Sequence, residues 1–229
     1  MQLTILGNSG PYPAPGGACS GYLLSQGDTH VLLDCGLGVL ARLQEHISLG
    51  ALSALVLTHL HFDHVSDAFD LAVAMEASGN ACPPETPAPQ RALLPAGARF
   101  AREFAVGPFS FCLHPARHPV EAYSLVIRCE TAKFVFTGDT NWHDGLIEMC
   151  RDADLLLADS AFFHAEWSAE KPHLSARLCG QLAREAGAKA LLLTHFPPGK
   201  DVRALEMEAQ AEFPSARAAK LGESYSIPC

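Results

Sequence analysis

The segment THLHFDHVSD, residues 58–67, places three histidines and an aspartate within six positions: His59, His61, Asp63 and His64. Imidazole nitrogens and carboxylate oxygens are natural ligands of zinc. The cluster directly follows the apolar run 51–57, so it lies where a buried strand is expected to end. Burying such polar groups without partners is costly. We therefore predict that these side chains bind metal.

The spacing of these four residues indicates two groups of ligands. In an extended chain His59, His61 and Asp63 share one face, whereas His64 has to come from the turn into the next helix. We expect His59 with His61 to bind one cation and Asp63 with His64 to bind another. Two-metal sites place their cations about 3.5–4 Å apart.

Two metals need further ligands, and three candidates lie beside predicted strands in the second half of the chain. Asp139 ends the apolar stretch FVFTGD, and its carboxylate could bridge two cations. His195 in ALLLTHFPP repeats the strand–Thr–His pattern of ALVLTHLHF. His118 precedes a strand in HPARHPVEAYSLVIR, where His114 competes for the same role.

The elements that position these residues are predicted from hydrophobic periodicity and from Gly and Pro. Strands are predicted at 2–6, 21–25, 30–33, 55–57, 109–113, 122–129, 133–137, 155–158 and 190–194, with an edge strand within 220–227. Helices are predicted at 38–46, 67–77, 144–150, 175–187 and 201–211. The Gly- and Pro-rich segments 7–21 and 79–90 are predicted to be irregular.

Strands come early and helices late in each half of the chain, which predicts an α/β sandwich of two sheets with helices outside. No linker separates the halves, so residues 1–229 are expected to form a single domain. A chain of this length buries enough surface to fold without disulfides or structural metals.

Composition narrows the classes of function. A formal net charge of −9 argues against broad nucleic-acid binding, which requires a basic surface. The eight cysteines are scattered without a CxxC pair, as expected for reduced thiols of a cytoplasmic protein. We expect neither a signal peptide nor a membrane span, because no basic and apolar leader and no apolar run of about 18 residues is visible.

At the residues described above, the chain resembles the metallo-β-lactamase fold superfamily. The shared marks are HxHxDH at 59–64, a later histidine at 118, Gly-Asp-Thr at 138–140 and a strand-end histidine at 195. LLDCG supplies Asp34, which matches the aspartate before the first long helix of the family. The resemblance extends from Leu3 to about His195 and implies a four-layer αβ/βα sandwich with the metal site at one edge of the sheets.

The resemblance also implies which residues bind each metal. One metal would be bound by His59, His61 and His118, a second by Asp63, His64 and His195, and Asp139 would bridge them. Asp34 would orient a ligand from outside the metal shell. Zinc is the expected cation for this nitrogen-rich set, with manganese and iron as alternatives.

Within the superfamily, the chain is most similar to the ribonuclease Z-like phosphodiesterase branch. The marks are RHPVEAYSLVIR and LGNSGPYPAPGGACSGYLL. Di-iron flavin-linked members carry a glutamate where this chain has His61, and true β-lactamases generally lack Asp139. In this branch a histidine paired with an acidic residue is thought to protonate the leaving oxygen, and His173 and Asp159 match that pair.

One departure from ribonuclease Z is expected to change the substrate. Asp139 follows His118 by 21 positions, which leaves room for two strands and a turn. The arm with which ribonuclease Z grips tRNA therefore has no place here, and tRNA processing is not expected.

We thus expect a dinuclear metal-dependent hydrolase of a small anionic phosphodiester. Two cations lower the pKa of a bridging water to about 7, and the resulting hydroxide attacks phosphorus. Asp63, His173 and Asp159 are the expected catalytic residues, and the resemblance implies a homodimer. One alternative is a lactone, thioester or other carbonyl substrate. Another is a non-catalytic metal-binding scaffold.

Overall fold

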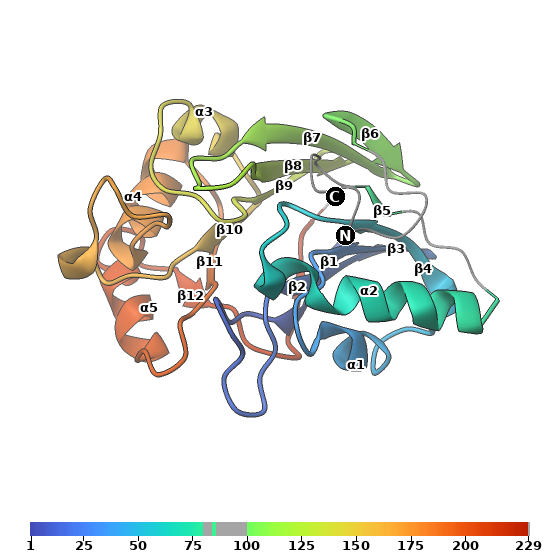
Figure 1. Cartoon of the computed structure of the whole chain (residues 1–229). Coiled ribbons are helices and arrows are strands. Elements are labelled where there is room, and N and C mark those ends of the chain that lie inside the picture. Colours follow the sequence, from blue (N-terminus) through green and yellow to red (C-terminus); the bar gives the residue numbers. More distant parts are fainter. Residues whose placement is uncertain (80–83, 86–99, 229) are drawn as a thin grey trace.

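The chain forms two β-sheets that pack face to face, with helices on both outer faces (Figure 1). This computed structural model describes residues 1–79, 84–85 and 100–228. The layers are those of the predicted four-layer αβ/βα sandwich, so the prediction of the fold class is confirmed.

The first sheet has six strands in the order β13-β1-β2-β3-β4-β5. Their bounds are β13 (Ser224–Ser226), β1 (Gln2–Gly7), β2 (Gly21–Gln26), β3 (Thr29–Leu33), β4 (Leu52–Val56) and β5 (Pro84–Glu85). The pairs β13–β1, β1–β2 and β2–β3 are antiparallel, whereas the pairs β3–β4 and β4–β5 are parallel.

The second sheet has seven strands in the order β12-β11-β10-β9-β8-β7-β6. Their bounds are β12 (Arg217–Ala218), β11 (Leu191–Thr194), β10 (Leu155–Asp159), β9 (Ala132–Phe136), β8 (Tyr123–Cys129), β7 (Phe109–Pro115) and β6 (Glu103–Val106). Strands β9 to β12 are parallel, and their near-continuous apolar runs suit a sheet that is covered on both faces.

Helices cover the outer face of each sheet (Figure 1). On the first sheet lie α1 (Val39–Leu43), the 3₁₀ turn η1 (Leu49–Ala51) and α2 (Phe62–Ala77). On the second lie α3 (Leu146–Cys150), the 3₁₀ turn η3 (His164–Glu166), α4 (Ala176–Ala186) and α5 (Val202–Gln210). No helix in the described ranges has the length and apolar character to cross a membrane.

Three apolar clusters hold these layers together. The cluster between the sheets contains Tyr22, Phe109, Phe134 and Phe136. A second cluster lies under α3, α4 and α5, and a third lies under α1 and α2. The largest core side chains are fully buried, so the sheets form a rigid base for the loops at their edge.

Several predicted bounds need correction. Helix α2 begins at Phe62 instead of residue 67, so Asp63 and His64 lie in its first helical turn and not in a loop or an extended segment. Helix α1 is shorter than predicted, and β6 and β12 were not predicted. Within 79–90, β5 interrupts the predicted irregular segment by pairing with β4. The rest of that prediction, from residue 80 onward, lies outside the described residues.

The start of α2 shows why periodicity missed it. Its buried face begins with Asp63, His64 and Asp67, where an amphipathic pattern would have apolar residues, while Phe62 is exposed. The Asp63 carboxylate in the first turn is favoured by the helix dipole. The first turns of α2 therefore direct the polar side chains of Asp63, His64 and Asp67 toward the interior.

Candidate metal centre

The predicted ligands converge at one edge of the two sheets, where several parallel strands end. His59 and His61 follow β4, and Asp63 and His64 begin α2. His118 follows β7, Asp139 follows β9 and His195 follows β11. The carboxyl ends of parallel strands are common places for ligand sites, because the loops that follow them meet there.

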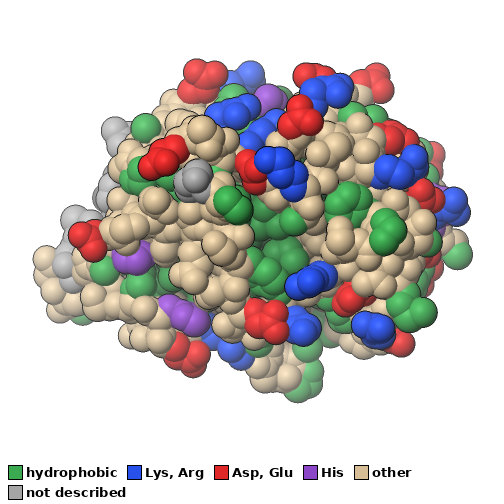
Figure 2. All heavy atoms as spheres, turned by 180° about the vertical axis from the view of Figure 1, so that it is seen from behind, with side chains coloured by type: hydrophobic (Ala, Val, Ile, Leu, Met, Phe, Trp, Pro, Cys, Tyr) green, Lys and Arg blue, Asp and Glu red, His purple; other side chains and the backbone are tan. Residues whose placement is uncertain are grey.

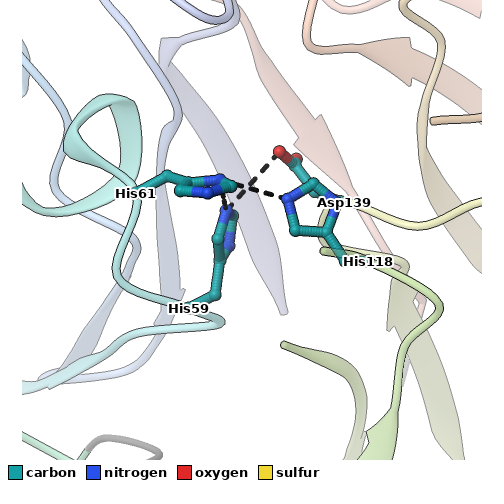
Figure 3. A group of neighbouring side chains, drawn as sticks. All are labelled: His59, His61, His118 and Asp139. Carbon is teal, nitrogen blue, oxygen red and sulfur yellow. Dashed lines mark hydrogen bonds and ion pairs between the residues drawn. The ribbon is translucent and has the colours of Figure 1, made fainter. Parts of the chain in front are cut away.

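The His118 group consists of His59, His61 and His118 together with Asp139 (Figure 3). His61 Nδ1 lies 3.0 Å from His59 Nε2 and 3.1 Å from His118 Nε2. The Asp139 carboxylate lies 3.6 Å from His59 Nε2. Three imidazoles from two separate loops thus point their nitrogens at one small volume.

The His195 group consists of Asp63, His64 and His195, again together with Asp139. His195 Nε2 lies 3.1 Å from Asp63 Oδ2 and 3.3 Å from Asp139 Oδ2. His64 Nε2 lies 3.3 Å from Asp139 Oδ1. Asp139 therefore faces both groups, and the structure brings all seven predicted ligands together. His114 lies elsewhere, with its Nε2 3.5 Å from Cys112 Sγ.

The environment of the His118 group favours the neutral form of its histidines. Burial lowers the pKa of His59 well below its ordinary value, and the nearby His64 lowers it further. Burial also lowers the pKa of His61 and of His118. Neutral imidazoles present lone pairs, as metal ligands must.

The carboxylates and His64 show that the centre favours positive charge. Burial alone would raise the pKa of Asp139, but His195 and His64 bring it well below the ordinary value. Burial alone would lower the pKa of His64, but Asp139 and Asp34 bring it well above that value. The negative charge of the carboxylates therefore stabilises a proton on His64. A bound metal cation would be stabilised by the same negative charge.

The hydrogen bonds at the outer ring nitrogens also fit metal binding. His64 Nδ1 donates to Asp34 Oδ2 at 2.8 Å, and His118 Nδ1 donates to the Pro172 carbonyl at 3.2 Å. Among the residues that the structure describes, none forms a hydrogen bond with the buried His64 Nε2, and the Asp139 carboxylate lies 3.3 Å away as an ion-pair partner. Metal-binding histidines commonly donate their other N–H in this way, which leaves the inner nitrogen free.

Asp34 supports the His195 group from behind, as predicted from the resemblance. The residue is fully buried, follows β3 and has a positive φ of 57°. Its carboxylate accepts hydrogen bonds from Thr58 N at 2.8 Å and from His64 Nδ1. His195 also has a positive φ, 61°. Such backbone conformations are costly for residues other than glycine and are often found at functional sites.

The predicted pair His173 and Asp159 lies beside this centre. His173 Nδ1 is 2.7 Å from Asp159 Oδ2 and 3.8 Å from Asp139 Oδ2. The His173 ring stacks on that of His195, with centroids 4.8 Å apart. Burial lowers the pKa of His173, but the charge and hydrogen bond of Asp159 raise it to about 9.

Two residues at the site were missed by sequence reasoning. A side chain on Gly10 would meet His195, because an added Cβ would lie 2.0 Å from His195 Nε2. Asn141 is fully buried two positions after Asp139 and contacts the loop that precedes His173. The Gly/Pro-rich segment 7–21 predicts a loop at Gly10 but not its contact with His195. Nothing in the sequence around Asn141 predicts its contact with the loop before His173.

Similarity to known proteins agrees with this geometry. Residues 29–196 match the family described as the beta-lactamase superfamily domain. The chain is 31% identical over 213 residues to the probable metallo-hydrolase YhfI of Bacillus subtilis, covering 86% of this chain and 87% of YhfI. The crystal structure of YhfI, described as a metallo-beta-lactamase fold protein, matches with a TM-score of 0.92 at 29% identity and 98% coverage of both chains.

Two more distant structures share the fold. The short form of human tRNase Z matches with a TM-score of 0.75 at 21% identity, over 100% of both chains. A diphosphatase of the PhnP family matches with a TM-score of 0.74 at 20% identity, over 99% of this chain and 98% of the other. The family match, the similarity to YhfI and the two-sheet architecture together show that this chain belongs to the beta-lactamase superfamily and has the metallo-β-lactamase fold.

Proposed function

We propose that this chain is a dinuclear metal-dependent phosphodiesterase that acts on a small anionic phosphodiester. The observation that carries the proposal is the pair of ligand groups that share Asp139, with His173 beside them. Divalent cations in such a site supply a nucleophile from water at neutral pH and neutralise charge on the phosphoryl oxygens.

The residues of the two groups would hold the cations in fixed positions. The His118 group offers three imidazole nitrogens, and the His195 group offers two imidazoles and the Asp63 carboxylate. Asp139 would contribute to both, because its Oδ2 lies near His59 of one group and His195 of the other, while its Oδ1 lies near His64. Five imidazoles favour zinc, with manganese and iron as alternatives.

His173 would act as the general acid. Its Nδ1–H is engaged by Asp159, which orients the ring and stabilises the imidazolium. Burial lowers the pKa of His173 but Asp159 raises it above its ordinary value, which favours the protonated ring that can give its proton to the leaving oxygen. General acid assistance is typically worth about 10²–10⁴-fold, most of all for a leaving group of high pKa.

Charge and space support a small phosphodiester over a carbonyl compound. The chain has a formal net charge of −9, which would repel an anionic substrate. Bound cations would supply the positive charge that attracts such a substrate to the site. Seen from behind, basic side chains lie among acidic ones on that face instead of forming one continuous patch (Figure 2).

Residues 118–139 form only β8, β9 and their connections, so this segment offers no arm for tRNA. Two structural neighbours are named a tRNase and a diphosphatase, which supports a phosphorus centre.

The test is hydrolysis by metal-loaded protein, with zinc or manganese, of bis(p-nitrophenyl) phosphate and of a dinucleoside phosphate. His173→Ala should lower kcat for the dinucleoside by about 10²–10⁴-fold. It should change hydrolysis of the p-nitrophenyl ester little, because p-nitrophenolate leaves without a proton. Hydrolysis of lactones or thioesters but not of phosphodiesters would favour the carbonyl alternative. A metal-loaded protein inert toward all of these would favour the scaffold.

Three further expectations stay predictions. A homodimer is implied by the ribonuclease Z-like resemblance, and sedimentation equilibrium would test it. A cytoplasmic location agrees with the free cysteines of the described chain and would be tested by cell fractionation. Residues 1–229 are expected to act as one domain, for which a single cooperative unfolding transition is the test.

A further inference from the structure

The residue proposed to donate the proton, His173, is carried by a loop and not by a regular element. Residues 167–172, which we call the acid loop, contain no helix or strand. Within residues 167–172, a single backbone–backbone hydrogen bond joins two loop residues, from Lys171 N to Ser168 O at 3.1 Å. The position of His173 therefore depends on side chains that reach the loop from other parts of the fold.

Asn141 makes most of these contacts. Its Nδ2 group donates to backbone carbonyls of Ser168 at 3.1 Å and Ala169 at 3.3 Å, and also to that of Lys171. Its Oδ1 atom accepts from Trp167 Nε1 at 2.9 Å. Asn141 is fully buried, so its amide is shielded from water even though the loop residues Ala169 and Lys171 are exposed.

Asn141 also forms hydrogen bonds near its own place in the chain, the loop that follows β9. Oδ1 of Asn141 accepts from the backbone N–H of Trp142 at 2.6 Å. The Asn141 backbone N–H donates to the Arg117 carbonyl at 2.9 Å. Asn141 thus lies between the segment that carries Asp139 and the segment that carries His118, and it ties both to the acid loop.

Two neighbours reinforce this connection. Arg117 Nη2 donates to the Ala169 carbonyl at 2.8 Å, and His118 Nδ1 donates to the Pro172 carbonyl. Arg117 is exposed, so its bond competes with water and is expected to be weaker than those of Asn141. Each of these hydrogen bonds to the acid loop comes from a side chain that is a proposed metal ligand or lies within two residues of one.

We propose that Asn141 is a positioning residue that holds the acid loop and thereby sets the place of His173 relative to the metal centre. The inference rests on the proposed role of His173 as proton donor. An amide side chain donates through its nitrogen and accepts through its oxygen, and this site uses both functions. Replacing the amide with a methyl group would remove these bonds to the loop carbonyls and leave the Trp167 indole N–H without its acceptor.

The kinetic test compares Asn141→Ala with His173→Ala on a dinucleoside phosphate and on bis(p-nitrophenyl) phosphate. Asn141→Ala should lower kcat for the dinucleoside by about 10²-fold or more, with KM little changed, and should spare the p-nitrophenyl ester. Adding Asn141→Ala to His173→Ala should cause no further loss, because both act through one proton transfer. Gln210→Ala is the matched control: its amide also donates to a backbone carbonyl, that of Ala216 at 2.9 Å, but lies on α5.

A second readout does not use activity. The two tryptophans of the chain, Trp142 and Trp167, both belong to this network. In a Trp142→Phe background Trp167 is the only fluorophore of its kind. Asn141→Ala should then shift Trp167 emission to longer wavelength and make it more accessible to acrylamide, with and without added zinc. Amide hydrogen exchange of residues 167–173 should become faster in the same variant.

The outcomes separate the inference from the proposed function. Equal losses on both substrates, additive losses with His173→Ala, or unchanged Trp167 quenching would each overturn the positioning role. If Asn141→Ala does not fold, Trp167→Phe removes a single hydrogen bond and should give a smaller loss with the same substrate pattern. A Trp167→Phe variant identical to wild type on both substrates would then contradict the inference. If His173→Ala itself spares the dinucleoside, the proton-donor role fails, while Trp167 fluorescence still decides whether Asn141 holds the loop.

Discussion

The two ligand groups differ in burial and in the residues behind them. All four side chains of the His195 group are buried, whereas His61 and His118 of the His118 group are only half-buried. His64 donates a hydrogen bond to the Asp34 carboxylate, whereas His118 donates one to the Pro172 backbone carbonyl. We infer that the His195 group is the more rigid and more strongly charged half, and that the His118 group faces the side from which substrate enters.

Asp139 belongs to both groups, so its loss should have the largest effect. Asp139→Ala removes the carboxylate that faces His59, His64 and His195. We expect metal content to fall at both groups and kcat/KM to fall by well over about 100-fold, the scale reached by changes outside the ligand shell alone. Metal analysis together with the phosphodiester assay measures this. Retention of both metals would show that Asp139 is not the shared ligand.

Comparing His195→Ala with His118→Ala should rank the two groups. A ligand that binds only the folded protein stabilises it by about 2.7 kcal/mol at 100 times its Kd, so zinc should raise Tm and a chelator should reverse this. We expect His195→Ala to lose more of the zinc-induced increase than His118→Ala, because its group is buried and more charged. Thermal unfolding with zinc and with EDTA is the measurement. Equal losses would remove the distinction between the groups.

Asp34→Asn tests the support behind one group only. The substitution keeps the shape but removes the charge that orients His64, and changes of this kind typically cost about 10–100-fold in metal affinity. Titration with zinc should show one weakened site and one unchanged site. Weakening of both sites would mean that Asp34 acts on the centre as a whole.

Gly10→Ala should have the smallest effect and should also act on the His195 group. The added methyl group would overlap the His195 ring, and such overpacking costs about 1–3 kcal/mol. We expect roughly tenfold lower kcat/KM, with ligands of the His118 group unaffected. Gly17→Ala in the same loop is the control, since its Cβ would approach only Ala14. A Gly10→Ala variant with wild-type activity and Tm would show that the loop around Gly10 can move away from His195 without loss of stability.

Much of the fold could be predicted because its signals are local. The apolar runs LLLAD and LLLT became β10 and β11, and Ser175 and Asp201 cap α4 and α5 through their side chains. The prediction failed where polar ligands replace the apolar pattern, at the start of α2. It also missed β5 and β12, which have two residues each and exist through pairing with neighbours.

The sequence by itself determined the chemistry of the ligands and the strand ends on which they lie, because residue type and hydrophobic periodicity are written in short segments. Only the tertiary structure decided that His118 and not His114 joins His61, that Gly10 lies against His195, and that Asn141 holds the loop before His173. These contacts join residues up to 185 positions apart in the chain. Their geometry depends on how two sheets pack and where each loop leaves its strand, which no short segment specifies.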